Sequence, residues 1–289
     1  MDRAASLTLV VVVPAGADPA PWIRAVAAAP AEACSLVLAY PRGAPAPGPA
    51  IESIFCAQGA SIFHLWGAAI PRATSAYVAV LDARCPPAAG WVAGAQRAIA
   101  EGVPAFFGPV TFARGGEDPA LVEYLLEYGQ FARPIAAGMG EVPGNNLVFR
   151  RDLLCADDLR DQQFHKVFFV DRLKLRGLAP LLRDEVEVIY EKRYRRLHYL
   201  RRRFAHGRTY AALRSAGQGF GFRVWRALTS PALPFLRLFR ITNSLRGKAA
   251  LQSALLRRAA YALVAETAWS IGECAGYLSA TPGDPAYLD

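Results

Sequence analysis

Short apolar runs separated by helical segments dominate the first 190 residues of the chain. The stretches Leu7–Val13 and Tyr77–Leu81 are almost continuously apolar, and Ser35–Tyr40 forms a third run. A strand covered on one face alternates apolar and polar residues, so unbroken runs indicate strands buried on both faces. Such strands, alternating with helical segments, are typical of a mostly parallel sheet flanked by helices. We therefore predict an α/β domain in which Tyr77–Leu81 is a central strand.

The same pattern predicts further elements up to residue 191. Pro86 and Pro87 favour the start of a helix that runs to about Ala100. Further strands are predicted at Ala105–Phe112, Leu147–Phe149 and residues 185–191, with helical segments after Pro119 and up to Arg176. Ligands of open α/β sheets lie beyond the carboxyl ends of the strands. The loop after Val13, residue Asp82 and the loop before Leu147 are therefore expected to share one crevice.

The charge distribution divides the chain after Glu191. Residues 1–191 contain 16 Lys and Arg and 20 Asp and Glu, whereas residues 192–265 contain 17 Lys and Arg and no carboxylate. Soluble domains normally mix both signs of charge on their surfaces, so this one-sided stretch indicates an anionic partner. We predict a domain of residues 1–191 and a basic, helical, membrane-associating region of residues 192–289.

An amphipathic helix is predicted at the start of the basic region. Its apolar residues recur at helical spacing, and arginines lie on the other side: Tyr194, Leu197, Leu200 and Phe204 against Arg195, Arg196, Arg202 and Arg203. This pattern is typical of a helix in the interface of an anionic bilayer, and Trp225 suits the same surface. Alternating Arg and aromatic residues also suit nucleic acid, but aliphatic residues among them favour the membrane. No apolar run is long and uninterrupted enough to predict a spanning helix.

The cysteines argue for a reducing compartment. Five of them, widely spaced and without a Cys-x-x-Cys pair, suggest neither a disulfide framework nor a zinc site. The first residues carry no net positive charge, so the run Leu7–Val13 is better interpreted as a core strand than as part of a signal peptide. We predict a cytoplasmic protein.

Several stretches, in this order, resemble family 2 glycosyltransferases of the GT-A fold. VVVVPAGADPAPWIRAV resembles their first strand and helix, AYVAVLDARCPPAAGW their Asp-x-Asp strand, and VPGNNLVFRRDLL their acceptor-side loop. DRLKLRG and the following basic run resemble the end of the catalytic domain. AETAWSIGECAGYL is similar to the membrane-associated tail of bacterial members that work on envelope polysaccharides. The resemblance covers nearly the whole chain.

This resemblance implies inverting transfer of a hexose from a nucleotide sugar to a lipid-linked or growing envelope polysaccharide. It places Pro14, Ala15, Asp82 and Arg84 at the donor. The Asp-x-Asp carboxylates of the family hold Mg²⁺ or Mn²⁺ against the diphosphate, but only Asp82 is present here to ligate a metal. Arg84 stands in place of the second Asp; it cannot bind a metal, but it can hydrogen-bond a phosphate. Either Arg84 takes the place of the metal ion, or the donor site is no longer functional.

The acceptor side departs from the family as well. Where members commonly carry an acidic pair that deprotonates the acceptor, this chain has His165 and Lys166. A neutral histidine satisfies the chemistry of a general base, and a shifted alignment would instead make Asp171 or Asp161 the base. The loop residues Gly144, Asn145 and Asn146 offer a tight turn and amide groups suited to sugar hydroxyls.

Two hypotheses of different classes follow. In the first, the chain is a glycosyltransferase bound peripherally to the cytoplasmic face of the inner membrane, with other glycosyltransferases as further partners. In the second, it is a catalytically inactive GT-A-like protein that binds a glycan or a partner glycosyltransferase. The altered Asp-x-Asp and acidic-pair positions are compatible with either. Nucleic acid is the less favoured partner, because a sheet with a crevice is predicted.

Overall fold

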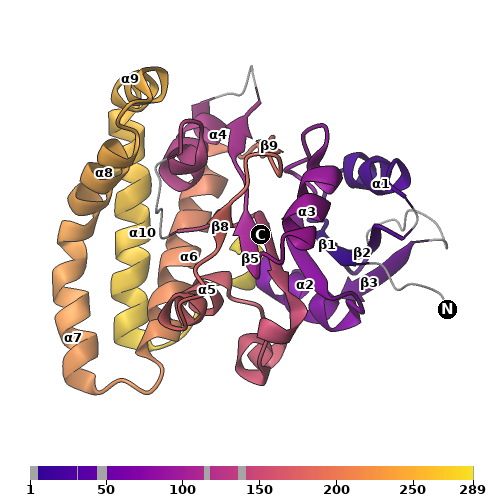
Figure 1. The fold of residues 1–289 in the computed structure, drawn as a ribbon. Coiled ribbons are helices and arrows are strands. Elements are labelled where there is room, and N and C mark those ends of the chain that lie inside the picture. Colours follow the sequence, from indigo (N-terminus) through magenta and orange to yellow (C-terminus); the bar gives the residue numbers. More distant parts are fainter. Residues whose placement is uncertain (1–5, 31, 44–50, 114–117, 136–140, 289) are drawn as a thin grey trace. The chain divides into compact units, whose positions relative to one another are not determined.

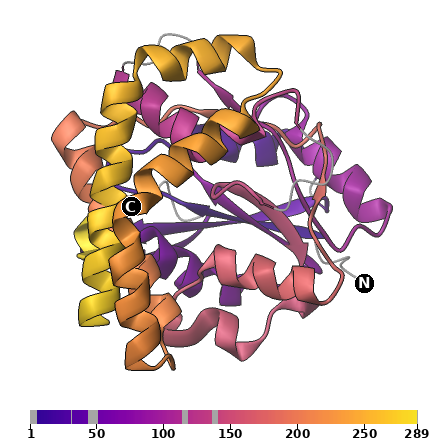
Figure 2. The same cartoon turned by 90° about the vertical axis from the view of Figure 1, so that its left-hand side faces the viewer.

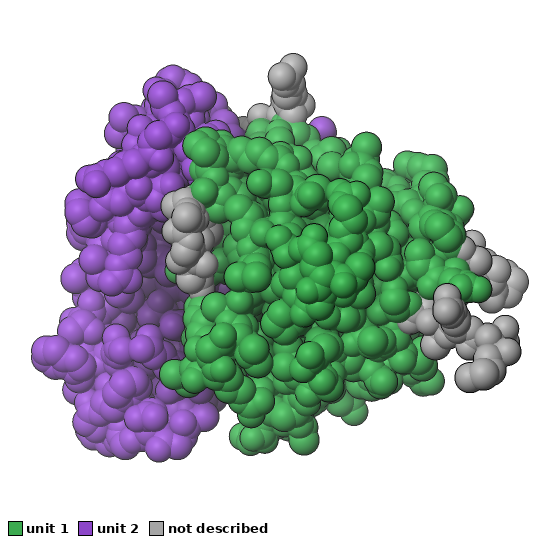
Figure 3. Space-filling view, in the orientation of Figure 1, with its two compact units in different colours: residues 1–113, 131–192 green, residues 114–130, 193–289 purple. Residues whose placement is uncertain are grey.

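The computed structural model describes residues 6–30, 32–43, 51–113, 118–135 and 141–288. The chain divides into two compact units, residues 1–113 with 131–192 and residues 114–130 with 193–289 (Figure 3). The division after Lys192 adjoins the change in charge after Glu191. Residues 114–130 group with the second unit, which differs from the predicted boundaries. Glu123 and Glu127 of this stretch bind Arg202 and Arg203 of the carboxyl-terminal part of the chain.

Unit 1 is built on a seven-stranded sheet of order β3-β2-β1-β4-β7-β5-β8 (Figure 1). Its strands are β1 (Leu7–Val12), β2 (Cys34–Pro41), β3 (Glu52–Cys56), β4 (Tyr77–Asp82), β5 (Ala105–Phe107), β7 (Asn146–Arg150) and β8 (Leu181–Leu182). All neighbours pair in parallel except β7, which runs antiparallel to both β4 and β5. The prediction of a mostly parallel sheet with a central strand at Tyr77–Leu81 is confirmed.

Helices cover both faces of this sheet, which explains the unbroken apolar runs (Figures 1 and 2). On one face, α2 (Ile62–Ala69) and α5 (Lys166–Leu175) pack with Val10, Val12 and Val80 into one hydrophobic cluster. The other helices of this unit are α1 (Ala20–Ala27) and α3 (Trp91–Ala100), joined by an edge-to-face contact of Trp22 and Trp91.

A second, small sheet pairs β6 (Val110–Phe112) with β9 (Val188–Tyr190) in parallel. Sequence reasoning joined β5 and β6 into one strand, but the backbone separates them at Gly108. A Cβ atom there would lie 2.0 Å from the carbonyl oxygen of Val186, so only glycine permits this approach. The helix expected from Pro86 begins at Trp91 instead, because Pro86 and Ala88 pair with residues 187–189.

Unit 2 is helical and contains α4 (Asp118–Glu123), α6 (Arg196–Ser215), α7 (Phe220–Thr229), α8 (Leu233–Ser244), α9 (Ala249–Arg257) and α10 (Ala259–Ser279). A π-helical turn, Tyr124–Tyr128, continues α4. The long helices α6 and α10 pack closely along their length. At Gly207, Gly272 and Gly276 a Cβ atom would lie 2.1–2.3 Å from a carbonyl oxygen of the facing helix. These glycines therefore set the approach of the two backbones.

A buried ion-pair network joins the helices of unit 2. It consists of three arginines and three glutamates: Arg202, Arg203, Arg237, Glu123, Glu127 and Glu266. Arg203 donates to Glu127 at 2.9 Å and to Glu266 at 2.5 Å. The expectation that Arg202 and Arg203 face a membrane is therefore wrong, because both side chains are buried among carboxylates that lie far away in sequence. Arg195 and Arg196 are exposed.

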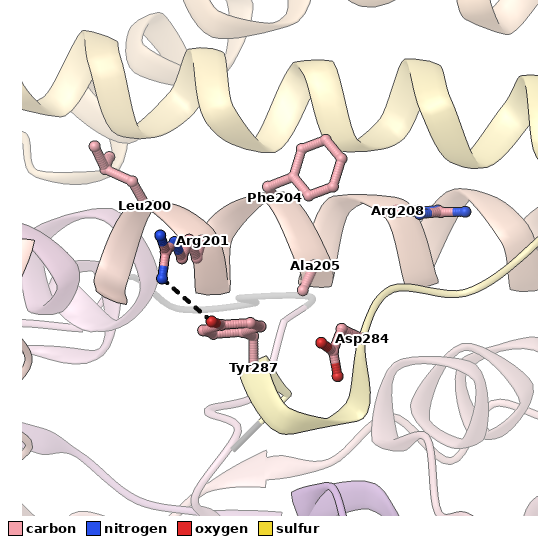
Figure 4. A pocket seen from close by; sticks show the side chains of 7 residues that line it. All are labelled: Leu200, Arg201, Phe204, Ala205, Arg208, Asp284 and Tyr287. Carbon is pink, nitrogen blue, oxygen red and sulfur yellow. Dashed lines mark hydrogen bonds between the residues drawn. The ribbon is translucent and has the colours of Figure 1, made fainter. Parts of the chain in front are cut away.

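The predicted apolar side of the same helix also differs from expectation. Leu200 and Phe204 line a hollow of about 360 Å³, together with Arg201, Ala205 and Arg208 of α6 and with Asp284 and Tyr287 (Figure 4). The hydroxyl of Tyr287 accepts a hydrogen bond from Arg201 at 3.4 Å. Leu197, in contrast, is exposed.

Exposed apolar residues of unit 2 concentrate on α7 and α8. Trp225, Leu228, Phe235 and Phe239 are spaced like one helical stripe that continues through Pro231, and each is at least 64% exposed. The exposed Arg240 lies at the end of this stripe, which we call the α7–α8 stripe. Among the described helices, none combines the length and hydropathy required to cross a membrane.

Candidate functional site

The carboxylate of Asp82, at the carboxyl end of β4, binds two cationic side chains. Its Oδ1 accepts hydrogen bonds from the backbone N (2.9 Å) and Nε (3.1 Å) of Arg84, and its Oδ2 accepts from an Nη atom of Arg84 at 3.0 Å. The Nζ atom of Lys192 lies 3.0 Å from the same Oδ2. We call Asp82, Arg84 and Lys192 the cation cluster. Asp82 is fully buried, the Lys192 side chain is 2% exposed and that of Arg84 13%.

A run of backbone hydrogen bonds brings Lys192 to Asp82. Residues 84–88 lie antiparallel to residues 187–191: Ala88 donates to Glu187, Ile189 to Pro86 and Glu191 to Arg84, at 2.8–3.1 Å. Because Glu191 is hydrogen-bonded to the backbone of Arg84, the next residue, Lys192, lies beside Asp82. Sequence reasoning located the change of charge at this point but did not identify Lys192 as a site residue. A signal was present, since Lys192 directly follows a predicted strand.

The electrostatics of the cluster favour an ionised Asp82. Burial alone would raise the pKa of its carboxyl group, but the charges of Arg84 and Lys192 and the hydrogen bonds from Arg84 hold it well below its usual range. The neighbouring thiol behaves differently: burial raises the pKa of Cys85 to about 12, so it is neutral at pH 7.

A divalent metal does not fit at Asp82. Mg²⁺ and Mn²⁺ favour several oxygen ligands, and both oxygens of this carboxylate already bind cationic groups. The residue at the second Asp position is an arginine, which is no ligand. Across the described parts of the chain, no three His, Cys, Asp or Glu side chains gather in a way that could hold a metal.

The two asparagines of the predicted acceptor loop have different environments. Asn145 is buried and its amide nitrogen donates to the sulfur of Cys85 at 2.7 Å, while its Oδ1 has no hydrogen-bond partner among the described residues. Asn146 is fully buried; its Oδ1 accepts from the Trp91 indole (3.2 Å) and its amide donates to the carbonyl of Val186 (2.5 Å). Both polar groups of Asn146 thus bind other parts of unit 1, and its contact with an acceptor stays a prediction.

His165 precedes the first residue of α5 in a mostly apolar environment. Its ring packs on Phe63 with 4.5 Å between centroids, and its Nε2 lies 3.0 Å from Oε1 of Gln163. Burial, with a smaller contribution from His64, lowers the pKa of His165 to about 4, so the imidazole is neutral at pH 7. The adjacent Lys166 donates to the carbonyl of Val142 at 3.0 Å, which places the start of α5 beside the loop that precedes β7.

The remaining predicted residues are more dispersed. Asp171 is 58% exposed on α5 and pairs with Lys174 at 3.1 Å, so it has the contacts of a surface residue. Asp161 is exposed and has a left-handed backbone with φ 55°. In the loop after β1, Pro14 is buried and Ala15 exposed, and Gly144 is half-buried.

The strand order and the paired helical layers define a GT-A-like fold with its cation cluster at the carboxyl edge of β4. Over 96% of this chain and 88% of the other, the fold is similar to that of the mannosyltransferase PcManGT from Pyrobaculum calidifontis in complex with GDP-Man and Mn²⁺, with a TM-score of 0.50 and 15% identity. S. aureus TarS 1–349 matches 64% of this chain, and 58% of its own length, with a TM-score of 0.41 and 12% identity. No family model and no curated protein matches the chain.

Proposed function

We propose that this protein is a glycosyltransferase that moves a hexose from a nucleotide-sugar donor to a lipid-linked or growing envelope glycan, with inversion. The observation that carries the proposal is the cation cluster, which lies at the carboxyl end of β4 in a GT-A-like sheet. Ligands of open α/β sheets bind at this edge, and cationic side chains there suit an anionic diphosphate. The solved neighbour that binds GDP-Man supports a nucleotide sugar as the donor class.

The reaction would balance as a single displacement. The acceptor hydroxyl oxygen forms a bond to the anomeric carbon while the bond from that carbon to the diphosphate oxygen breaks. The electron pair of the broken bond stays on the diphosphate, which gains one negative charge and leaves as the nucleoside diphosphate. Arg84 is the member of the cation cluster that reaches the surface, and it would stabilise this charge.

His165 would take the proton of the acceptor hydroxyl. Its imidazole is neutral at pH 7 and lies at the start of α5, beside the loop that carries Asn145. With a pKa of about 4 it is a weaker base than an exposed histidine, which favours slow turnover near neutral pH. As the general base we favour His165 over Asp171, because the Asp171 carboxylate is exposed and pairs with Lys174.

Asn145 would contact a sugar hydroxyl. Its buried Oδ1 has no partner among the described residues, and such an unsatisfied acceptor costs about 1–3 kcal/mol. A hydroxyl donor from a ligand would remove this cost.

The protein would work at the cytoplasmic face of the inner membrane. The α7–α8 stripe offers Trp225, Leu228, Phe235 and Phe239 to a bilayer interface, and a basic region without carboxylates from residue 192 to 265 suits anionic lipid. A lipid-linked acceptor would be met at the same surface.

A specific observation favours a second candidate, a catalytically inactive GT-A-like protein that binds a glycan or another glycosyltransferase. Asp82 and Asn146, both expected to contact substrates, are fully buried and bonded within unit 1. Such burial also occurs when a former active site has become part of the core.

Transfer and binding can be separated by one pair of measurements. Isothermal titration with UDP, GDP and TDP shows whether a nucleotide site exists, and release of the nucleoside diphosphate from the matching nucleotide sugar shows whether the donor bond breaks. We expect binding and slow release that decreases in His165→Gln. Binding without any release would support the inactive protein. Absence of binding to all three nucleotides would contradict the transferase and leave the inactive, glycan- or partner-binding protein as the favoured candidate.

A further inference from the structure

We infer that Arg84 and Lys192 together take the place of the divalent metal, so that the donor diphosphate is bound and released without any metal ion. This inference rests on the proposed function and deepens it. It starts from a disagreement: the fold leads one to expect a metal at the end of β4, and the residues present there do not fit one. Lys192 supplies a second cation to this carboxylate from a distant part of the chain.

In this arrangement, Asp82 acts as a clamp on two cations and not as a metal ligand. Its two oxygens hold Arg84 through three hydrogen bonds and Lys192 through a contact of 3.0 Å. A metal would have to displace both partners and leave their charges in a site where Asp82 is fully buried and Lys192 nearly so. Unpaired buried charges are strongly unfavourable, so the clamp excludes the metal.

The two cations differ in what they offer a diphosphate. The guanidinium of Arg84 binds Asp82 through Nε and an Nη atom, and its planar, multi-donor geometry suits phosphate oxygens. Lys192 is the more buried of the two and contributes a compact positive charge to the same carboxylate oxygen. Arg84 would therefore touch the phosphates directly, whereas Lys192 would position Asp82 and Arg84 and add its field.

The backbone fixes this arrangement before any ligand arrives. Hydrogen bonds between residues 84–88 and 187–191 hold the segments that carry Arg84 and Lys192 side by side. Fixed charges that need no rearrangement stabilise a developing anion more effectively than mobile ones. When the glycosidic bond breaks, the electron pair moves to the diphosphate oxygen, and the extra negative charge forms next to these cations. No metal enters or leaves in this cycle.

The experiment is a titration of the full chain with UDP, GDP and TDP, each in EDTA and in Mn²⁺. The variants are Arg84→Gln and Lys192→Met, with Lys192→Arg to test for rescue by a retained cation. Arg150→Gln is the matched control: Arg150 also pairs with an aspartate two residues away, but it lies beside Tyr77, at the opposite end of β4. Circular dichroism of each variant verifies that it folds.

We expect the wild type to bind one of the nucleotides equally well in EDTA and in Mn²⁺. Arg84→Gln should weaken binding at least tenfold, Lys192→Met several-fold, and Lys192→Arg and Arg150→Gln less than twofold. Binding that requires Mn²⁺ would overturn this inference and leave the proposed function in place, as would binding in EDTA that neither Arg84→Gln nor Lys192→Met weakens. Absence of binding under every condition would contradict the proposed function itself.

Discussion

The two units each bury arginines against carboxylates, but they do so in different ways. In unit 2, three arginines and three glutamates from five helical segments form a matched set around Glu266, and two of the guanidiniums, those of Arg203 and Arg237, also lie 4.5 and 4.6 Å from the Trp269 ring centroid. In unit 1, a single carboxylate, Asp82, holds two cations at the end of a strand. The matched network connects several helices, whereas the single carboxylate of Asp82 holds two positive charges side by side at the end of a strand.

The largest effect is expected when the shared carboxylate of the unit 2 network is removed. Glu266→Ala removes this partner from the buried Arg203 and the partly buried Arg237, so the free energy of unfolding should fall by about 3–5 kcal/mol. Urea denaturation measures it. Glu101→Ala, which breaks the more exposed pair with Arg183, is the control and should cost less than about 1 kcal/mol. Equal losses in the two variants would show that the network contributes little.

A glycine substitution tests whether packing or charge holds the same helices. Gly207→Ala places a methyl group 2.2 Å from the carbonyl oxygen of Trp269, so the helices must separate and the free energy of unfolding should fall by about 1–3 kcal/mol. Thermal unfolding followed by circular dichroism measures it. Gly221→Ala, in α7 with open space around it, should instead stabilise the protein by about 0.5–1 kcal/mol. An unchanged free energy of unfolding in Gly207→Ala would show that α6 and α10 can move apart without loss of stability.

Low pH should affect the buried histidines and not the arginines. Arginines stay charged at every pH in this range, whereas neutral buried histidines become protonated as the pH falls. Burial lowers the pKa values of His64 and His165, with Asp161 opposing the shift at His64. The unfolded chain then binds protons more readily than the folded chain between pH 6.5 and about 4. Stability should be fully retained above pH 6.5 and fall, through His165, by up to about 1.4 kcal/mol per pH unit between pH 6.5 and about 4; His64 contributes a loss in the same direction.

The measurement for this prediction is urea denaturation at a series of pH values. His165→Phe should make the decline shallower, since it removes the group whose pKa is most lowered and keeps a ring against Phe63. An unchanged slope would show that His165 remains protonatable in the folded chain.

The smallest effect on stability is expected at Lys192. Lys192→Met removes one cation but leaves Asp82 bound to Arg84, so the loss should be about 1 kcal/mol. Calorimetric melting measures it. A loss as large as that of Glu266→Ala would remove the distinction between the two units and make the cation cluster primarily a structural feature.

The core of unit 1 could be predicted from the sequence because its signals are local. Leu7–Val12 and Tyr77–Leu81 are almost continuously apolar runs, and this pattern alone predicts their burial on both faces. The strand Glu52–Cys56 and the helix Ile62–Ala69 were not predicted, since neither shows a clear period. The split at Gly108 depends on a close approach to Val186, which no local pattern encodes.

The site was harder to predict because its partners are distant in sequence. Asp82 and Arg84 stand two residues apart and were identified, but Lys192 meets them only through the pairing with residues 84–88. Likewise, Arg202 and Arg203 have the spacing of an exposed basic face, and their glutamates lie between 63 and 79 residues away. The charge pattern alone therefore does not distinguish an arginine that faces lipid from one that forms buried ion pairs between helices.

The α7–α8 stripe has a practical consequence for anyone handling the purified chain. Because its indole, phenyl and leucyl groups are exposed to water, we expect the free protein to self-associate at high concentration, with two copies covering one another's stripes. Colloidal behaviour, and not only ligand affinity, then sets the usable concentration range in calorimetry. A mild detergent or a lipid nanodisc that covers Trp225 and Phe235 should extend that range.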